Sequence, residues 1–166
     1  MPKILVLFTG QPSATVNAVA DGARSVRFSE VEMRRVANAG SDGDVPRGIH
    51  LTLTDAEEMM PYDAIVVAAS AGGSLDPALT QVLAQAAAST PASAWQNKVG
   101  SAFLAEESGG SADVWPALAQ LGTMGMLVVA PSASSTDAAR ELGVRVAKVV
   151  GWVTHARSHH HDHHTH

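Results

Sequence analysis

The sequence predicts an α/β fold, a three-layer, doubly wound arrangement in which helices cover both faces of a parallel five-stranded sheet. Apolar runs such as Ile4–Phe8 and Ala64–Ala69 are continuous rather than alternating, which is typical of strands buried on both faces. Helical segments separate these runs along the chain. Hydrophobic residues make up 46% of the sequence but aromatic residues only 4%, so the core must consist of small aliphatic side chains that allow close packing. A chain of 166 residues fits one domain.

The N-terminal part shows two strands and two helices. A serine before the first helix and a Thr-x-x-Glu pattern before the second are signals of a helix N-terminus. The second strand has a looser, partly alternating pattern, which indicates a half-exposed edge strand. The predicted elements are a strand over Lys3–Phe8, a helix from about Ser13 to Ala23, an edge strand over about 25–36, a turn-rich loop over 39–48 and a short helix starting at Thr54, with Glu57 completing its capping box.

The rest of the chain alternates strands with helices and ends in a histidine-rich segment. Asp76 and Pro77 form a helix-start signal, and Gly122 is a helix-stop signal. The predicted elements are strands over Ala64–Ala69, Lys98–Ala105 and Met124–Ala130, and helices over Pro77–Ser89, Ala112–Gly122 and about Thr136–Thr154. We expect one domain over residues 1–154 and a tail over 155–166.

Charge and cysteine content exclude several classes of function. The net charge of -5 and the absence of a basic stripe argue against a nucleic-acid partner. The absence of cysteine excludes disulfides, thiolate metal ligands and cysteine nucleophiles. The sequence shows neither a signal peptide nor a membrane span, so we expect a cytoplasmic protein without a membrane partner.

The loops that follow the strands are the candidate binding region. In doubly wound sheets, ligands bind beyond the carboxyl ends of the strands. The loop from Thr9 to Ser13 leads into a helix N-terminus, which favours an anion such as phosphate. The loops at 70–74 and 106–111 are small and polar, so a ligand could approach their backbone closely. Turns are also rich in such residues for purely conformational reasons, and both interpretations stay open here.

Other chemistries on such a scaffold lack their motifs. A receiver domain requires acidic residues after the first strand and an aspartate after the third, where this chain has Phe8-Thr9 and Ala69-Ser70. Neither a Gly-x-Gly-x-x-Gly nor a Gly-x-x-x-x-Gly-Lys-Ser/Thr motif is present, and there is no Gly-x-Ser-x-Gly elbow. The Glu106-Glu107 pair suits an acid/base, a metal ligand or a solvated strand end.

Nearly the whole chain resembles the flavodoxin-like proteins, and within them the WrbA-type NAD(P)H:quinone oxidoreductases and related FMN-binding flavodoxins. The resemblance rests mainly on scaffold segments. They are residues 3–8 with the helix at 16–23, and the segments 62–67, 98–103 and 121–131. It implies strand order 2-1-3-4-5, with FMN phosphate at the first loop and the isoalloxazine ring between the loops after the third and fourth strands.

Carried over residue by residue, the resemblance implies an FMN site without a catalytic side chain. The residues that would bind the phosphate are Thr9, Gln11, Ser13, Ala14 and Thr15. The residues that would flank the ribityl chain and the ring are Ser70, Ala71, Gly72 and Gly73 (continuing to Ser74), together with Glu107, Ser108, Gly109 and Gly110. The implied small-molecule partners are FMN, NAD(P)H and a quinone.

Three departures from the family pattern predict a weakened cofactor site. Pro12 stands where the family usually has glycine, and proline has no N–H to donate. The loop after the third strand lacks the aromatic residue that often covers the flavin, and a stacked aromatic contributes about 1–3 kcal/mol in comparable sites. The loop after the fourth strand is also shorter than the family's glycine-rich insertion.

The tail holds seven of the eight histidines. Imidazole suits divalent transition metals, and a His-rich run can chelate without a preformed site. The candidate ligands are His159, His160, His161, His163, His164 and His166. A solvated appendage, a pH-sensitive charge cluster and an artificial tag are the alternatives.

Three functions remain open. The first is an FMN-binding oxidoreductase that passes electrons from NAD(P)H to a quinone or another acceptor. The second is a flavodoxin-like module that lacks FMN and acts as a binding partner, and the third is a metal-handling accessory protein. The family also implies a homo-oligomer, for which Trp95, Trp115 and Trp152 are candidate interface residues, core or surface packing being the alternative for each.

Overall fold

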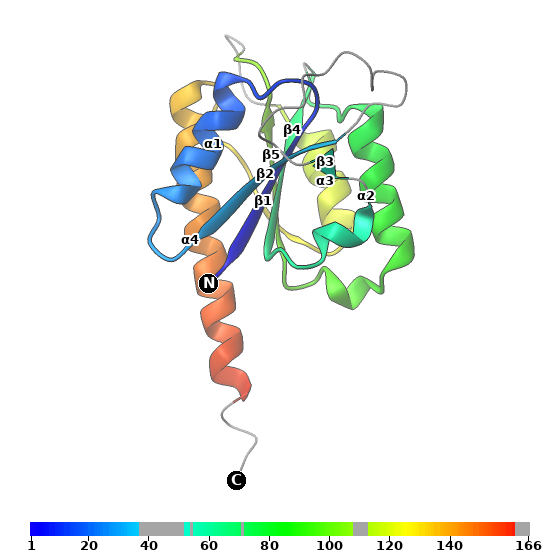
Figure 1. The fold of residues 1–166 in the computed structure, drawn as a ribbon, viewed down its shortest axis with the longest axis vertical. Coiled ribbons are helices and arrows are strands. Elements are labelled where there is room, and N and C mark those ends of the chain that lie inside the picture. The colour runs from blue at the N-terminus through cyan, green and yellow to red at the C-terminus, as the bar shows by residue number, and fades with distance from the viewer. Residues whose placement is uncertain (37–51, 54, 71, 108–112, 162–166) are drawn as a thin grey trace.

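The computed structural model describes residues 1–36, 52–53, 55–70, 72–107 and 113–161. Over these residues it shows a parallel sheet between two layers of helices, as the sequence predicts (Figure 1). The strands are β1 (Lys3–Phe8), β2 (Glu30–Val36), β3 (Thr52–Leu53), β4 (Ala64–Ala69), β5 (Val99–Leu104) and β6 (Leu127–Val129). The helices are α1 (Ala14–Arg24), α2 (Pro77–Ser89), α3 (Trp115–Thr123) and α4 (Thr136–His161), with short 3-10 helices η1 (Ala56–Met59) and η2 (Ala92–Ala94).

The strand order confirms the predicted topology. Among the described residues the sheet runs β3-β2-β1-β4-β5-β6, and every neighbouring pair is parallel. Without the two-residue edge strand β3, this is the predicted five-stranded order 2-1-3-4-5. The order reverses between β1 and β4, which places a switch point for ligand binding where these two strands end.

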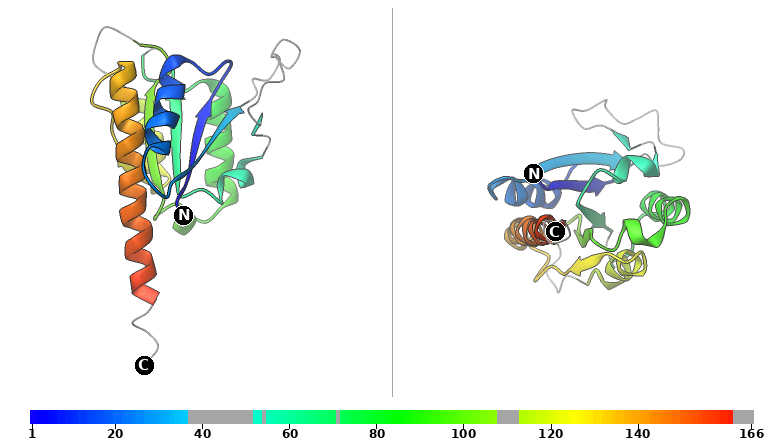
Figure 2. Two further views of the ribbon diagram at one scale, coloured as in Figure 1. Left: turned by 60° about the vertical axis from the view of Figure 1, so that its left-hand side comes forward. Right: turned by 90° about the horizontal axis from the view of Figure 1, so that it is seen from below.

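Each face of the sheet has its own hydrophobic core. Successive β1 residues point to opposite faces, so Ile4 and Val6 pack with α1 and α4, whereas Leu5 and Leu7 pack with α2, α3 and η1. Seen from below, the two helix layers lie on either side of the strands (Figure 2). The continuous apolar sequence of β4 is explained in the same way, because all six of its residues are buried.

Several predicted boundaries require correction. β2 begins at Glu30 rather than near Ser25, because residues up to 29 form the turn after α1. The capping box of the short helix uses Asp55 and Glu58, one residue later than predicted, and the helix is 3-10. α3 begins at Trp115, and β6 is shorter than predicted because Met124 is the C-cap of α3 and Gly125 turns the chain with φ 101°.

α4 is longer than predicted. It continues past Thr154 through the first histidines of the tail to His161. Its last part projects beyond the edge of the sheet at which β1 begins (Figures 1 and 2). The predicted loop over 39–48 lies outside the described residues.

Candidate functional site

The carboxyl ends of β1, β4 and β5 meet at one edge of the sheet, the upper edge in Figure 1. The register pairs Leu7 with Val67 and Ala69 with Leu104, so the strands end nearly level. The loops that begin at Thr9, Ser70 and Ala105 therefore leave the sheet at the same edge. This brings the three predicted loop regions together.

The N-terminus of α1 lies at this edge and offers backbone amides. Ser13 is the N-cap, and its Oγ accepts a hydrogen bond from Val16 N at 3.3 Å. Helix geometry leaves the N–H groups of Ala14 and Thr15 without an intrahelical acceptor, and Ala14 is exposed. Two amides and the positive end of the helix dipole are thus available to an anion.

Two of the hydroxyl groups predicted to bind phosphate, those of Ser13 and Thr15, have protein partners. Thr15 is 2% exposed, and its Oγ1 donates to Ala105 O at 2.5 Å and lies 3.0 Å from Ser13 Oγ. Thr15 therefore ties α1 to the end of β5 and orients Ser13. Thr9 is half-buried, and Gln11 is exposed beyond the turn at Gly10, whose φ is 68°.

The loop after β4 turns tightly against the segment before α3. Ser70 N donates to Ser74 O, and Gly73 N donates to Ser70 O. A Cβ on Gly73 would lie 1.9 Å from Asp113 O, so only glycine permits this approach. Gly72 has φ 88° and is exposed, and a Cβ added to it would meet no other described residue within 4 Å. The predicted residue Ala71 lies outside the described residues.

Glu107 contacts the start of α4. Its Oε1 accepts hydrogen bonds from the backbone N of Thr136 at 2.6 Å and from the Thr136 hydroxyl. These hydrogen bonds lower the pKa of Glu107 below its ordinary value. Glu107 thus caps α4, and its proximity to the ribityl chain or the ring stays a prediction. Ser108, Gly109 and Gly110 lie outside the described residues.

The histidines of the tail are divided between helix and undescribed chain. His159, His160 and His161 belong to α4, and His163, His164 and His166 lie outside the described residues. No group of three or more His, Asp or Glu side chains suited to a metal occurs in the part of the chain that the structure describes. Metal binding by the tail therefore stays a prediction.

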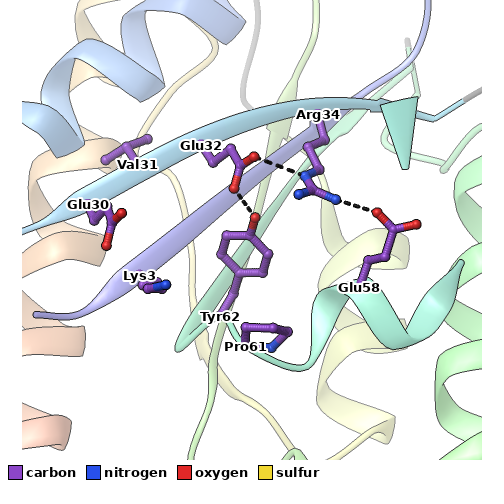
Figure 3. A pocket seen from close by; sticks show the side chains of 8 residues that line it. All are labelled: Lys3, Glu30, Val31, Glu32, Arg34, Glu58, Pro61 and Tyr62. Carbon is purple, nitrogen blue, oxygen red and sulfur yellow. Dashed lines mark hydrogen bonds and ion pairs between the residues drawn. The ribbon is translucent and has the colours of Figure 1, made fainter. Parts of the chain in front are cut away.

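A polar pocket of about 580 Å³ on β2 and η1 was not predicted from the sequence (Figure 3). Arg34 contacts Glu32 at 3.2 Å and Glu58 at 2.5 Å, and the Tyr62 hydroxyl donates to Glu32. Burial, and then the hydrogen bond to Glu32, raise the pKa of Tyr62 to about 12. The alternating charges of β2 were the available signal, because they place Glu32 and Arg34 on one face.

Two further observations concern partners. Trp95, an interface candidate, is 1% exposed and lies in the core, where its Nε1 donates to Thr90, whereas Trp115 and Trp152 are 70% and 69% exposed. Within the described ranges, no helix is both long and apolar enough to cross a bilayer.

Comparison with known proteins establishes the fold class. No protein family and no curated protein matches the sequence. The structure is similar to the two-electron reduced flavodoxin of Megasphaera elsdenii, with a TM-score of 0.55 and 18% identity over 88% of this chain and 98% of that one. It is also similar to the Trp repressor binding protein of Bacillus subtilis (TM-score 0.56, 13% identity, 86% and 99% covered) and the flavodoxin of Streptococcus pneumoniae TIGR4 (0.53, 15%, 90% and 98%). At these identities the similarity shows the fold, which is flavodoxin-like.

Proposed function

We propose that this protein binds FMN at the carboxyl edge of its sheet and acts as a flavodoxin-like oxidoreductase that passes electrons from NAD(P)H to a quinone or another acceptor. One observation carries the proposal. The amides at the α1 N-terminus and the loops after β4 and β5 lie at one edge, beside the switch point of the sheet. The fold is similar to that of a flavodoxin, a protein named after its flavin, which supports a flavin as the ligand.

The described residues fit the phosphate end of FMN. The amides of Ala14 and Thr15 have no intrahelical acceptor at the start of α1, where Ala14 is exposed, and the Ser13 hydroxyl is hydrogen-bonded to Thr15. Thr9 and Gln11 belong to the same loop. These residues would hold the phosphate, while Gly72 and Gly73 present backbone to the ribityl chain. Bound FMN supplies the hydride and electron chemistry, so the protein's task is to bind and orient.

We further propose that phosphate binding is weakened. Pro12 contributes no N–H, the hydroxyls of Ser13 and Thr15 already bond to each other, and Thr15 also donates to Ala105 O. The backbone amides of α1 then carry most of the interaction with the phosphate. A hydrogen bond to a charged group is worth about 1.5–3 kcal/mol, so each missing donor lowers affinity about tenfold or more.

Equilibrium titration with FMN and with riboflavin tests the proposal. Quenching of flavin fluorescence reports binding of either ligand, and only FMN carries the phosphate. We expect FMN to bind at least about tenfold more tightly than riboflavin, because of the charge-assisted bonds to the α1 amides. Failure to bind either flavin, or equal affinity for both, would contradict the proposed site.

The NAD(P)H-to-quinone activity has its own test. Steady-state oxidation of NADH and NADPH by the FMN-loaded protein is measured with a soluble quinone. Turnover that depends on both FMN and quinone supports the oxidoreductase. Failure of both nucleotides to reduce the loaded protein would contradict the proposed NAD(P)H-dependent activity.

A second candidate is a flavodoxin-like module without FMN. The engagement of Ser13, Thr15 and Glu107 within the protein favours it, because these groups need no ligand to satisfy them. Such a module would act by binding partners, and the exposed Trp115 and Trp152 are candidate residues for a homo-oligomer interface. A colourless protein that takes up no added FMN, but sediments as an oligomer, would support this candidate.

A further inference from the structure

The end of α4 holds two imidazoles against each other. His155 and His159 lie four residues apart on the helix, and their Nε2 atoms are 3.1 Å apart. The ring centroids are 4.4 Å apart, and the ring planes are nearly perpendicular, at 82°. Both side chains are exposed, and they belong to α4, whose C-terminal part projects beyond the sheet (Figure 2).

This separation suits a metal ion bound by both rings. Histidine nitrogens lie about 2.0–2.1 Å from a zinc-sized ion, so nitrogens 3.1 Å apart would subtend an angle of roughly 95–100° at the ion. That angle lies between the values for octahedral and tetrahedral coordination. Two histidines at i and i+4 on one helix face are also the arrangement found in helical zinc motifs.

We propose that His155 and His159 form a bidentate site for a late first-row divalent ion, with Cu²⁺ bound more tightly than Zn²⁺. Imidazole ligands suit both ions, and affinities for a given nitrogen site increase toward copper. Water or an external donor completes the coordination. The site is independent of the proposed FMN function, and it includes His155, which was not among the predicted tail ligands.

Metal-free, the same geometry is an imidazole hydrogen bond, in which one Nε2–H donates to the other Nε2. Binding of an ion requires both Nε2 lone pairs. The donor ring therefore moves its proton to Nδ1, and no proton is lost from the pair. The ion then bridges one turn of α4, which stabilises the helix at its projecting end.

Trp152 offers a local reporter. It lies three residues before His155 on α4, and both side chains line a groove of about 640 Å³ that also includes Met1 and Phe28. Trp152 is 69% exposed. Because Cu²⁺ quenches nearby indole emission, an ion at the histidine pair should quench Trp152, and the Trp152→Phe variant should lose that part of the quenching.

The test is titration of the full-length chain with CuCl₂ by tryptophan emission and with ZnCl₂ by calorimetry. Three proteins are compared: wild type, His155→Ala, and a triple variant with His163, His164 and His166 changed to alanine. The second ligand of a chelate acts at high effective concentration, so we expect His155→Ala to weaken binding of both ions by about tenfold or more. The triple variant should keep the wild-type affinity for the tightest site.

A second readout follows the helix. Hydrogen exchange at the amides of 156–161 should slow on addition of Zn²⁺ in the wild type and in the triple variant, and should not change in His155→Ala. Equal affinity of wild type and His155→Ala would overturn the proposal. So would loss of the tightest site in the triple variant, since the ion would then be bound by the distal histidines.

Discussion

At the scale of single residues, Pro12 is the position that most directly limits the proposed FMN site. It precedes the N-cap of α1 and has no N–H to direct at an anion. Both Pro12→Gly and Pro12→Ala restore a donor, worth about 1.5 kcal/mol toward a charged acceptor. We expect both variants to bind FMN about tenfold more tightly in the fluorescence titration. Unchanged affinity in both would indicate a loop that does not contact the phosphate.

The neighbouring residues Gly73 and Gly72 allow a controlled comparison of two alanine substitutions. Both have positive φ, at 80° and 88°, so alanine at either costs about 1–2 kcal/mol for the left-handed backbone. Only Gly73→Ala also forces a Cβ against Asp113 O, which adds about 1–3 kcal/mol. We expect Gly73→Ala to lower the free energy of unfolding measurably more than Gly72→Ala. Equal losses in chemical denaturation would mean that the two loops do not approach as described.

Tyr62 is the only tyrosine in the sequence, so phenolate absorbance reports it alone. Its pKa of about 12 in the folded protein exceeds the ordinary 10.0, which means that folding favours the neutral phenol. The resulting stabilisation is fully present below pH 10 and is lost as the pH rises through about 12.

Spectrophotometric titration checks this value. We expect a midpoint near 12 for the folded chain and near 10 in denaturant. In Glu32→Gln the folded midpoint should fall but stay above 10, because the loss of the carboxylate leaves the burial of Tyr62 in place. A folded midpoint of 10 in the wild type would contradict the polar network.

For single residues, the sequence predicted where a residue lies in a helix or loop better than it predicted which residue it hydrogen-bonds to. Ser13 was recognisable as an N-cap from its place before a helix, and the structure confirms it. The bonds from Thr15 to Ala105 O and from Thr136 to Glu107 join residues 90 and 29 positions apart. Local sequence patterns carry no record of such contacts, so the engagement of the predicted ligand groups could not be foreseen.

At the scale of elements, α1 and α4 pack closely because glycines stand at their crossing. A Cβ on Gly143 would lie 2.1 Å from Val19 O, and one on Gly22 would lie 2.0 Å from Arg140 O. Gly143→Ala should therefore lower the free energy of unfolding by about 1–3 kcal/mol, since the helices must separate.

Gly151 on the same helix is the matched control for this prediction. A Cβ there would meet no other described residue within 4 Å, so alanine should raise the free energy of unfolding by up to about 1 kcal/mol through helix propensity. Urea denaturation of both variants checks the pair. Destabilisation by Gly151→Ala, or tolerance of Gly143→Ala, would argue against this helix crossing.

The ends of a strand could be predicted from the sequence where every residue of the strand is buried. β4 is buried at every position, so its continuous apolar sequence gave both its type and its limits. At the sheet edges this signal fails. β6 leaves Leu127 and Val128 exposed, and β2 has an alternating charged sequence with only two of its seven residues buried. The polar pocket at Glu32, Arg34 and Tyr62 lies on this partly exposed strand.

At the scale of the whole molecule, the topology places the proposed FMN-binding edge and the histidine pair at opposite ends. The loops after β1, β4 and β5 lie at the carboxyl edge, whereas α4 projects past the amino edge (Figure 1). The fold order was predictable because a family resemblance and the buried strands agreed. The extension of α4 could not be predicted, because the tail with its seven histidines shows no hydrophobic periodicity that would indicate where the helix ends.

FMN binding at the carboxyl edge is tested most directly by NMR mapping on the ¹⁵N-labelled protein. Amide shifts are followed as FMN is added, and riboflavin serves as the control ligand. We predict the largest FMN-specific shifts at the amides of Ala14 and Thr15, with further shifts at Gly72 and Gly73 for both ligands. Shifts confined to other surfaces, such as the pocket at Tyr62 or the groove at Trp152, or no shifts at all, would contradict binding at this edge.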